Sequence, residues 1–280
     1  MVPPVRSVLY VPGSNERALD KARGLPVDAI VFDLEDAVAP EAKGDARDAL
    51  RGALSQGGYR ARLLLVRVNG AGTPWGSDDL SAFAQAECDG ILLPKVDGPD
   101  DVAAAAARTP KPIWAMMETP RGIVNAARIA DAPRTGGLVL GTNDLAKDLG
   151  CAPGPDRMPL MGALQACLLA ARAAGIPCID GVYNALRDAD GLRAECEQGR
   201  ALGFDGKTLI HPAQLAVANA VFAPSPEEVD HARRTIAAFD EAAARGQGVA
   251  VLDGRIVENL HVDTARRTLA RVDTIEAAGG

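Results

Sequence analysis

The sequence contains few of the residues from which disulfide frameworks, zinc sites and basic surfaces are built. Among its 280 residues are five cysteines, an odd number with no C-x-x-C pair, and three histidines. Cysteines of this number and spacing indicate reduced thiols in a cytoplasmic protein. Because histidine is so scarce, any metal site is expected to use oxygen ligands.

Basic residues and long apolar runs are also few. The chain has 30 Lys and Arg against 37 Asp and Glu, and the formal net charge of −7 argues against nucleic acid as a partner. The first residues, MVPPVRSVLYVPG, lack the long apolar core of a secretory signal, and no apolar run reaches about 18 residues. We therefore expect no membrane association and a cytoplasmic location.

What the sequence has instead is eight short apolar runs: SVLYVPG, DAIVFDLED, LLLVRVN, GILLPKV, IWAMMET, GLVLGTND, CIDGVY and GKTLIHP. They are continuous rather than alternating, which is typical of parallel strands covered on both faces. Helix-like stretches lie between them, several closed by a C-cap glycine. This alternation predicts an α/β fold, a (β/α)8 TIM barrel over residues 1–220. A doubly wound open sheet is the alternative, although no G-x-G-x-x-G follows any run.

Polar residues gather where the runs end. In a barrel these positions form the carboxyl-terminal face of the strands, which carries the chemistry. Chance would scatter charged residues along the runs. The residues concerned are Asp33, Glu35, Asp36, Arg67, Asn69, Lys95, Glu118, Asn143, Asp144, Asp180 and His211.

Glu118 and Asp144 end the fifth and sixth runs and are the candidate metal ligands. Neighbouring strands lie about 4.8 Å apart, so two such carboxylates can share one cation. Few protein ligands, all of them oxygen, suit Mg²⁺, and Mn²⁺ could replace it. The alternative is that each carboxylate pairs with a local arginine or caps the following helix.

Arg67 ends the third run between valines, where a cation needs an anionic partner. One interpretation is an ion pair with Asp33, Glu35 or Asp36 of the preceding run. The other is recognition of a substrate carboxylate or a developing oxyanion. Glu35 and Asp36 would then orient Arg67 or hold metal-bound water. Lys95 could balance this acidic cluster, either as a structural ion pair or in catalysis.

Residues 221–280 lie outside the eightfold alternation. APSPEEVDHARRTIAAFDEAAARG reads as one helix, with Ser225 as N-cap, Pro226 at the first position and Glu228 completing a capping box. A short strand-like or turn segment and a final helical run follow. We expect an extension that packs on the barrel or covers the active site of a neighbouring subunit.

Eight segments in this order resemble the citrate lyase beta-subunit-like family: RSVLYVPG, FDLEDAVAPEAKGDAR, RVN, LPKV, ETPRGIVNA, GTNDLAKDLG, IDGVY and GFDGKTLIHPAQ. That family belongs to the HpcH/HpaI aldolase group, together with malyl-CoA, citramalyl-CoA and β-methylmalyl-CoA lyases. The resemblance covers nearly the whole chain. It implies a TIM barrel, a homotrimer or hexamer, and Mg²⁺-dependent cleavage or formation of a C–C bond beside a coenzyme A thioester.

The resemblance also implies roles for individual residues. The family's metal ligands fall on Glu118 and Asp144, and its substrate-binding arginine falls on Arg67. Positions that contact coenzyme A in similar lyases fall on Tyr10, Arg17, Lys21 and the Ile210–His211 pair, with Lys43 and Arg47 as further phosphate partners.

The tail departs from the family's pattern. The lyases carry a DGKMID.P segment whose acid reaches into an active site, often that of the adjacent subunit. Here the segment is DGRIVENLHV, with Glu258 where Asp is usual and Leu260 where Pro is usual. A displacement of about 1 Å can cost on the order of 100-fold in rate, so tail chemistry is in question.

The expected reaction is retro-Claisen cleavage of a 3-hydroxy-3-carboxyacyl thioester of the malyl-, citramalyl- or citryl-CoA type, to an acyl-CoA and a 2-keto acid. Mg²⁺ and Arg67 would stabilise the developing charge, and Glu258 would exchange a proton with the acyl carbon. Alternatives are an aldolase on free hydroxy-keto acids, a thioesterase-like or synthase-like activity, and a non-catalytic paralogue that binds an acyl thioester.

Overall fold

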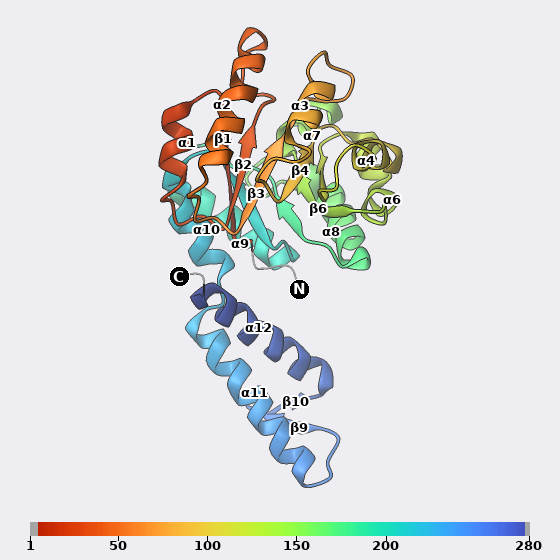
Figure 1. The fold of residues 1–280 in the computed structure, drawn as a ribbon. Coiled ribbons are helices and arrows are strands. Elements are labelled where there is room, and N and C mark those ends of the chain that lie inside the picture. Colours follow the sequence, from red (N-terminus) through yellow and green to blue (C-terminus); the bar gives the residue numbers. More distant parts are fainter. Residues whose placement is uncertain (1–4, 278–280) are drawn as a thin grey trace. The chain divides into compact units, whose positions relative to one another are not determined.

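The barrel is built from eight parallel strands that pair in chain order and close on themselves (Figure 1). The structure is a computed structural model and describes residues 5–277. Since β1 pairs with both β2 and β8, the predicted TIM barrel is confirmed and the open sheet is excluded. The strands are β1 (Ser7–Pro12), β2 (Ala29–Asp33), β3 (Leu63–Arg67), β4 (Gly90–Leu93), β5 (Ile113–Met117), β6 (Thr135–Leu140), β7 (Cys178–Asp180) and β8 (Gly206–Leu209).

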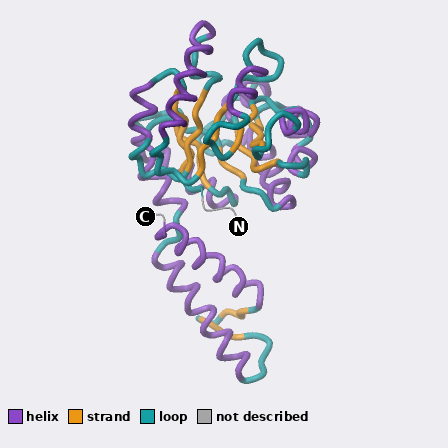
Figure 2. The backbone as a smooth tube through the Cα atoms, in the orientation of Figure 1, coloured by secondary structure: helices purple, strands orange, loops and turns teal. Residues whose placement is uncertain are grey.

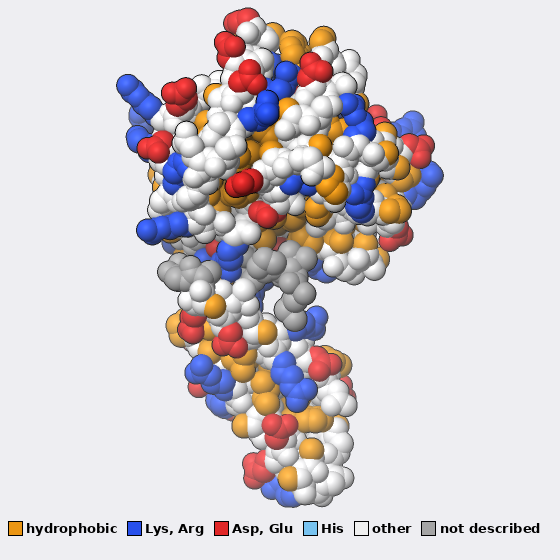
Figure 3. Space-filling model, viewed as in Figure 1, with side chains coloured by type: hydrophobic (Ala, Val, Ile, Leu, Met, Phe, Trp, Pro, Cys, Tyr) orange, Lys and Arg blue, Asp and Glu red, His pale blue; other side chains and the backbone are white. Residues whose placement is uncertain are grey.

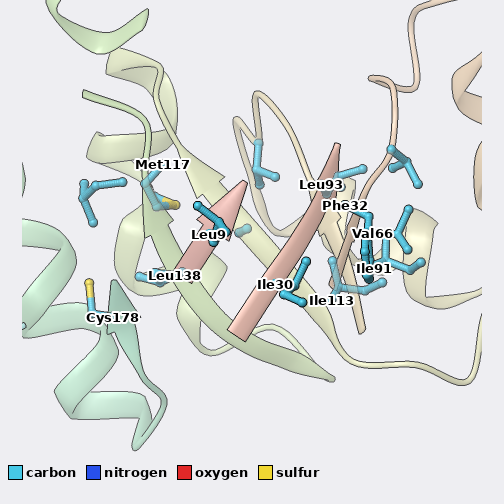
Figure 4. Close-up of a cluster of buried hydrophobic side chains, with 14 of the residues drawn as sticks. Leu9, Ile30, Phe32, Val66, Ile91, Leu93, Ile113, Met117, Leu138 and Cys178 are labelled. Atoms are coloured by element: carbon cyan, nitrogen blue, oxygen red, sulfur yellow. The ribbon is translucent and has the colours of Figure 1, made fainter. Parts of the chain in front are cut away.

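Alternate side chains of each strand build two separate cores. Val8, Val31 and Leu65 belong to the set that fills the barrel interior. Their sequence neighbours, such as Leu9 and Ile30, pack in the larger core to which the surrounding helices contribute (Figure 4). Side chains two positions apart on a strand face the same side, so the interior residues identify which side chains at the strand ends also face the interior.

Helices follow every strand and cover the barrel. Three of them end at a glycine in the left-handed conformation, namely Gly150, Gly175 and Gly203, as the C-cap pattern predicts. The α-helices are α1 (Glu16–Ala22), α2 (Lys43–Gln56), α3 (Gly76–Phe83), α4 (Pro99–Ala106), α5 (Pro120–Val124), α6 (Ala126–Ala130), α7 (Thr142–Leu149), α8 (Met161–Ala174), α9 (Ala189–Leu202) and α10 (Leu215–Phe222); the 3-10 turns are η1 (Pro40–Ala42), η2 (Met158–Leu160) and η3 (Pro212–Gln214).

Residues 223–277 form a second compact unit. Its two long helices, α11 (Pro226–Ala244) and α12 (Asn259–Ala277), pack on each other, and β9 (Ala250–Leu252) pairs antiparallel with β10 (Arg255–Val257) between them (Figure 2). The predicted capping box is present, because Ser225 and Glu228 exchange hydrogen bonds at the start of α11. A small core joins Ala242, Val257 and Val262.

The surface of the barrel mixes charges of both signs, with acidic and basic side chains interspersed on the face that Figure 3 shows. Within residues 5–277, no helix combines the length and the apolar character that crossing a membrane requires.

Candidate active site

Four polar side chains share the inward parity of the barrel strands and lie at their carboxyl ends. Tyr10, Asp33 and Arg67 are on β1, β2 and β3, and Glu118 directly follows β5. They line one pocket of about 340 Å³, to which Asp36, Gly141, Asp144, Asn184 and Ile210 also contribute. The pocket therefore occupies the end of the barrel at which TIM-barrel enzymes carry out their chemistry.

Glu118 is a buried carboxylate, only 2% exposed. Its Oε1 accepts a hydrogen bond of 2.7 Å from the backbone N–H of Lys95, and no lysine or arginine side chain of residues 5–277 forms an ion pair with it. Burial, reinforced by the charge of Glu35, raises the pKa of Glu118 from 4.5 to about 7, although the Lys95 hydrogen bond opposes the shift. A buried carboxylate in this state is stabilised when a cation binds beside it.

Gly141 leaves space beside Glu118 where any other residue would fill it. A Cβ atom at position 141 would lie 2.3 Å from Glu118 Oε2. Three residues later, in the first turn of α7, the side chain of Asp144 is one-third exposed at the same pocket.

This donor set fits a magnesium ion. Among residues 5–277, no group of three or more His, Cys, Asp and Glu side chains is close enough to hold a metal. Two carboxylates beside an open pocket suit Mg²⁺, which keeps several waters and takes oxygens from its substrate. Glu118 and Asp144 are the residues that would hold it.

Lys95 joins three of the acidic residues around the pocket. Its backbone has φ of 50°, a left-handed conformation that costs a non-glycine residue roughly 1 kcal/mol. In this conformation the N–H reaches Glu118, while Nζ lies 3.0 Å from Glu35 Oε1 and 3.2 Å from Asp144 Oδ2. Lys95 was expected to balance the acidic cluster, and in the structure its ammonium does contact two of these acidic side chains, Glu35 and Asp144.

Arg67 lies inside the acidic cluster that follows β2. Its Nε and Nη2 donate to the two oxygens of Asp33 at 2.7 and 2.6 Å, and Nη1 donates to Asp36 Oδ2 at 3.2 Å. Nη1 also lies 3.0 Å from Glu35 Oε2. The guanidinium stacks over Tyr10, with 5.0 Å between its carbon and the ring centroid. Both sequence interpretations survive, because a guanidinium has five N–H donors and these hydrogen bonds use three of them.

Glu35 is held behind the pocket by Lys43. The buried Lys43 ammonium donates to the backbone carbonyls of Leu34 and Glu35 at 2.8 and 2.9 Å. Burial raises the pKa of Glu35, although Arg67 opposes the shift. Lys43 is thus used inside the fold, and the expectation that it meets a coenzyme A phosphate is wrong.

The expected coenzyme A contacts follow β1 and β8, which are neighbouring strands of the barrel. Arg17 and Lys21 are exposed on α1, and Arg17 lines a second cavity between α1 and α2. His211 is exposed and uses Nδ1 to cap η3 through the backbone N–H of Ala213. Arg47, offered as a phosphate partner, instead donates to the buried Asp79 at 2.7 Å.

Asp180 does not belong to the active site, contrary to the grouping of strand-end residues. It has the opposite parity to the interior residue Ile179 and is fully buried on the helix side of β7. There Arg157 and Lys207 bind its two oxygens at 2.7 and 3.1 Å, and Glu195 completes the network at 2.6 Å from Lys207. This network fastens α9 and the segment before α8 to the strand.

Two interactions at the pocket were not anticipated. The side-chain amides of Asn143 and Asn184 exchange hydrogen bonds of 3.3 and 2.8 Å, which join the start of α7 to the loop after β7. Thr119 donates to Asp97 at 2.5 Å and so ties the residue after Glu118 to the loop that contains Lys95. Asn143 was among the polar residues expected at the strand ends. Its pairing with Asn184, and that of Thr119 with Asp97, could not be predicted, because the residues of each pair follow different strands.

This geometry defines a class of protein: a TIM barrel whose strands carry, at their carboxyl ends, an oxygen-lined pocket suited to a divalent cation. The chain belongs to the HpcH/HpaI aldolase/citrate lyase family, whose profile matches residues 6–212. The family resemblance drawn from the motifs is therefore confirmed.

Individual relatives refine this assignment. A (3S)-malyl-CoA thioesterase of Cereibacter sphaeroides is 62% identical over 275 residues, 98% of this chain and 96% of the relative. The citrate lyase subunit beta of Escherichia coli is 38% identical, over 96% and 93% of the two chains. The CitE protein of Mycobacterium tuberculosis, solved with magnesium, acetoacetate and coenzyme A, is 32% identical with a TM-score of 0.82 over 97% and 98% of the chains.

The expectation of a carbon–carbon lyase is wrong. Relatives that share 60–62% of their residues with this chain over nearly its whole length are thioesterases, which are hydrolases. The error has a physical origin. A metal site and an arginine at the strand ends orient an acidic acyl thioester equally well for breaking the C–S bond or the C–C bond.

Proposed function

We propose that this protein is a Mg²⁺-dependent thioesterase that hydrolyses (3S)-malyl-CoA or a closely similar 3-hydroxy-3-carboxyacyl thioester. The observation that carries the proposal is the 62% identity with a (3S)-malyl-CoA thioesterase across 98% of the chain. The pocket supports it, since two carboxylates that would bind a cation lie there together with an arginine suited to an anionic acyl group.

In the proposed reaction a water oxygen adds to the thioester carbonyl carbon and the C–S bond breaks. One proton of the water passes to a base and one reaches the departing sulfur, so that a carboxylate and a thiol form and the C–C bonds stay intact. When bound, Mg²⁺ supplies Lewis-acid polarisation for substrate oxygens. Glu118 and Asp144 are the residues that would hold it.

Arg67 and Asp36 take the other two roles. Beyond its contacts with Asp33, Asp36 and Glu35, Arg67 keeps one N–H donor on Nη2, and this donor would bind the free carboxylate of the acyl group. Asp36 lines the pocket with a side chain that is 65% exposed, and only its Oδ2 contacts Arg67. Its Oδ1 would hold the attacking water and accept the proton. Glu35 orients Arg67 from behind.

The thioester's coenzyme A portion would leave the pocket past Tyr10 and Ile210. We propose that Tyr10 and His211 contact it close to the pocket, and that Arg17 and Lys21 meet its phosphates. The support is that Tyr10 and Ile210 line the pocket while the two basic side chains are exposed on α1.

Two expectations about the tail stay predictions: that it covers an active site, and that Glu258 is catalytic. Glu258 is exposed at the start of α12, where its backbone N–H donates to His261 Nδ1 at 3.0 Å. Hydrolysis requires no proton at the acyl carbon, so the proton exchange expected of Glu258 has no counterpart in the proposed reaction. A Glu258→Gln variant with unchanged thioester hydrolysis would exclude it from catalysis. A homotrimer or hexamer also stays a prediction.

Product analysis tests the proposal directly. With (3S)-malyl-CoA and Mg²⁺, purified protein is expected to release free thiol and malate in equal amounts, and chelation of the metal is expected to stop the reaction. Asp144→Asn should abolish both Mg²⁺ binding and turnover. Formation of acetyl-CoA and glyoxylate without free thiol, or no turnover at all, would contradict it.

A further inference from the structure

Lys95 makes two different contacts with the proposed metal ligands, one through its backbone and one through its side chain. The backbone N–H binds Glu118 Oε1 at 2.7 Å and depends only on the left-handed turn at this residue. The ammonium lies 3.2 Å from Asp144 Oδ2 and 3.0 Å from Glu35 Oε1. A cation is therefore already bound to one of the two carboxylates that would hold the metal.

We propose that the Lys95 ammonium neutralises the acidic cluster while the metal is absent and is displaced from Asp144 when Mg²⁺ binds. The inference rests on the metal-binding part of the proposed function. It assigns to Lys95 the role of a competing internal cation, which lowers the affinity for Mg²⁺ and stabilises the metal-free protein.

The charges around the pocket require such a counter-ion. Arg67 is committed to the acids that follow β2, so Lys95 is the cation that reaches Asp144 within residues 5–277. A lysine ammonium carries its charge at physiological pH, so Lys95 can leave Asp144 only by moving. The groups that face its Nζ carry acidic charge: Glu35, Glu118 and Asp144.

The structure leaves room for that movement. The side chain of Lys95 is half-exposed, and Lys95 also lines a cavity of about 410 Å³ between α3 and α4. Because the ammonium also donates to Glu35 Oε1 at 3.0 Å, the side chain can keep this ion pair while it releases Asp144. The backbone hydrogen bond to Glu118 does not change in this step.

Lys95→Met separates the two contacts. Methionine keeps a side chain of similar length and the same Cβ at the left-handed position, so the backbone N–H still binds Glu118. It removes the ammonium that competes for Asp144. Lys95→Arg is the charge-retaining control. Lys147→Met is the matched control, because Lys147 is exposed on the same helix as Asp144 and the substitution removes the same charge at a residue that does not line the pocket.

Isothermal titration of the metal-free, full-length protein with MgCl₂, in the absence of substrate, measures the predicted effect. Removal of a unit charge a few ångströms from the ion, at a half-exposed position, is expected to tighten Mg²⁺ binding by about tenfold at low ionic strength. Lys95→Arg and Lys147→Met are expected to stay within about twofold of the wild type. With chelator present, the melting temperature of Lys95→Met should fall below that of the wild type. Added Mg²⁺ should raise the melting temperature of Lys95→Met by more than it raises that of the wild type.

The outcomes separate the inference from the proposed function. If the wild type binds Mg²⁺ and Lys95→Met binds it equally or more weakly, the displacement is wrong while the metal site stands. If the wild type binds no Mg²⁺, both are wrong. Lys95→Gln, which keeps a polar side chain without charge, provides the same comparison if the methionine variant does not fold.

Discussion

Gly141 and Glu118 are packed so closely that a Cβ atom at position 141 would meet both Oε2 and Cβ of Glu118, at 2.3 and 2.4 Å. The two residues directly follow the adjacent strands β5 and β6, and Glu118 has no ion-pair partner among residues 5–277 that could hold it elsewhere. The absence of a side chain at position 141 therefore fixes where the Glu118 carboxylate lies.

Gly141→Ala is expected to displace Glu118 and to abolish Mg²⁺ binding. Overpacking at such a site destabilises a protein by typically 1–3 kcal/mol, so the variant should fold with a lowered melting temperature. Calorimetric titration with MgCl₂ measures the loss. Gly162→Ala is the control, because a Cβ there meets no atom within 4 Å and should leave Mg²⁺ binding unchanged. Normal affinity in Gly141→Ala would show that Glu118 is not a ligand.

The raised pKa of Glu118 predicts how the stability of the metal-free protein depends on pH. Its pKa is 4.5 when unperturbed and about 7 in the folded protein, mainly because of burial. Folding favours the protonated form of Glu118, so this carboxyl group stabilises the folded protein at pH values below 4.5. The contribution is lost as the pH rises to about 7. The difference corresponds to at most about 3 kcal/mol.

Glu118→Gln should therefore be more stable than the wild type at pH 8 in chelator, and no more stable at pH 4.5. Urea unfolding at the two pH values measures the difference. The same variant is expected to lose Mg²⁺ binding, so that added MgCl₂ stabilises only the wild type. Equal stabilities at pH 8 would mean that the buried carboxylate already has a compensating partner in the metal-free protein.

Arg67→Lys tests the paired hydrogen bonds between Arg67 and Asp33. A lysine cannot donate to both oxygens of Asp33 in the plane that the guanidinium uses, and the pair is nearly inaccessible to solvent, at 8% and 2% exposure. We expect a loss of about 2–3 kcal/mol in unfolding free energy and about 100-fold in kcat/KM. Arg172→Lys, at an arginine that is 47% exposed beside Asp205, should cost less than about 1 kcal/mol. An active, stable Arg67→Lys protein would remove Arg67 from substrate binding.

The barrel could be predicted from the sequence because its signal is repeated. Seven of the eight apolar runs contain a whole strand, and β6 begins two residues before its run, at Thr135. The capping box at Ser225 marks the start of α11. These are local patterns, and each depends on a few neighbouring residues. The sequence does not show which side chains of a strand buried on both faces point into the barrel, because both alternating sets of side chains are apolar. Sequence therefore placed Asp180 with Glu118, although the two side chains face opposite sides of the barrel wall.

Contacts between distant segments explain the other differences. Lys43 was expected to meet a ligand, but it binds the carbonyls of Leu34 and Glu35. The pair of Asn143 and Asn184 joins α7 to the loop after β7 across a separation of 41 residues. The bond that the enzyme breaks is harder still to predict, since motifs at the strand ends record how the substrate is held and not which of its bonds is positioned for attack.

The buried network around Lys207 supplies a last prediction, which separates support of the fold from support of the site. Lys207 is inaccessible to solvent and binds Asp180, Glu195 and the carbonyl of Gly181 at 3.1, 2.6 and 2.7 Å. Lys207→Met leaves these acids with too few donors and should cost about 3–5 kcal/mol, measured by urea unfolding. Adding Glu195→Gln removes one of the unpaired charges, so the double variant should recover part of that loss. Because the network lies on the helix side of β7, the folded double variant should bind Mg²⁺ as the wild type does; weakened binding would show that the network also positions the metal ligands.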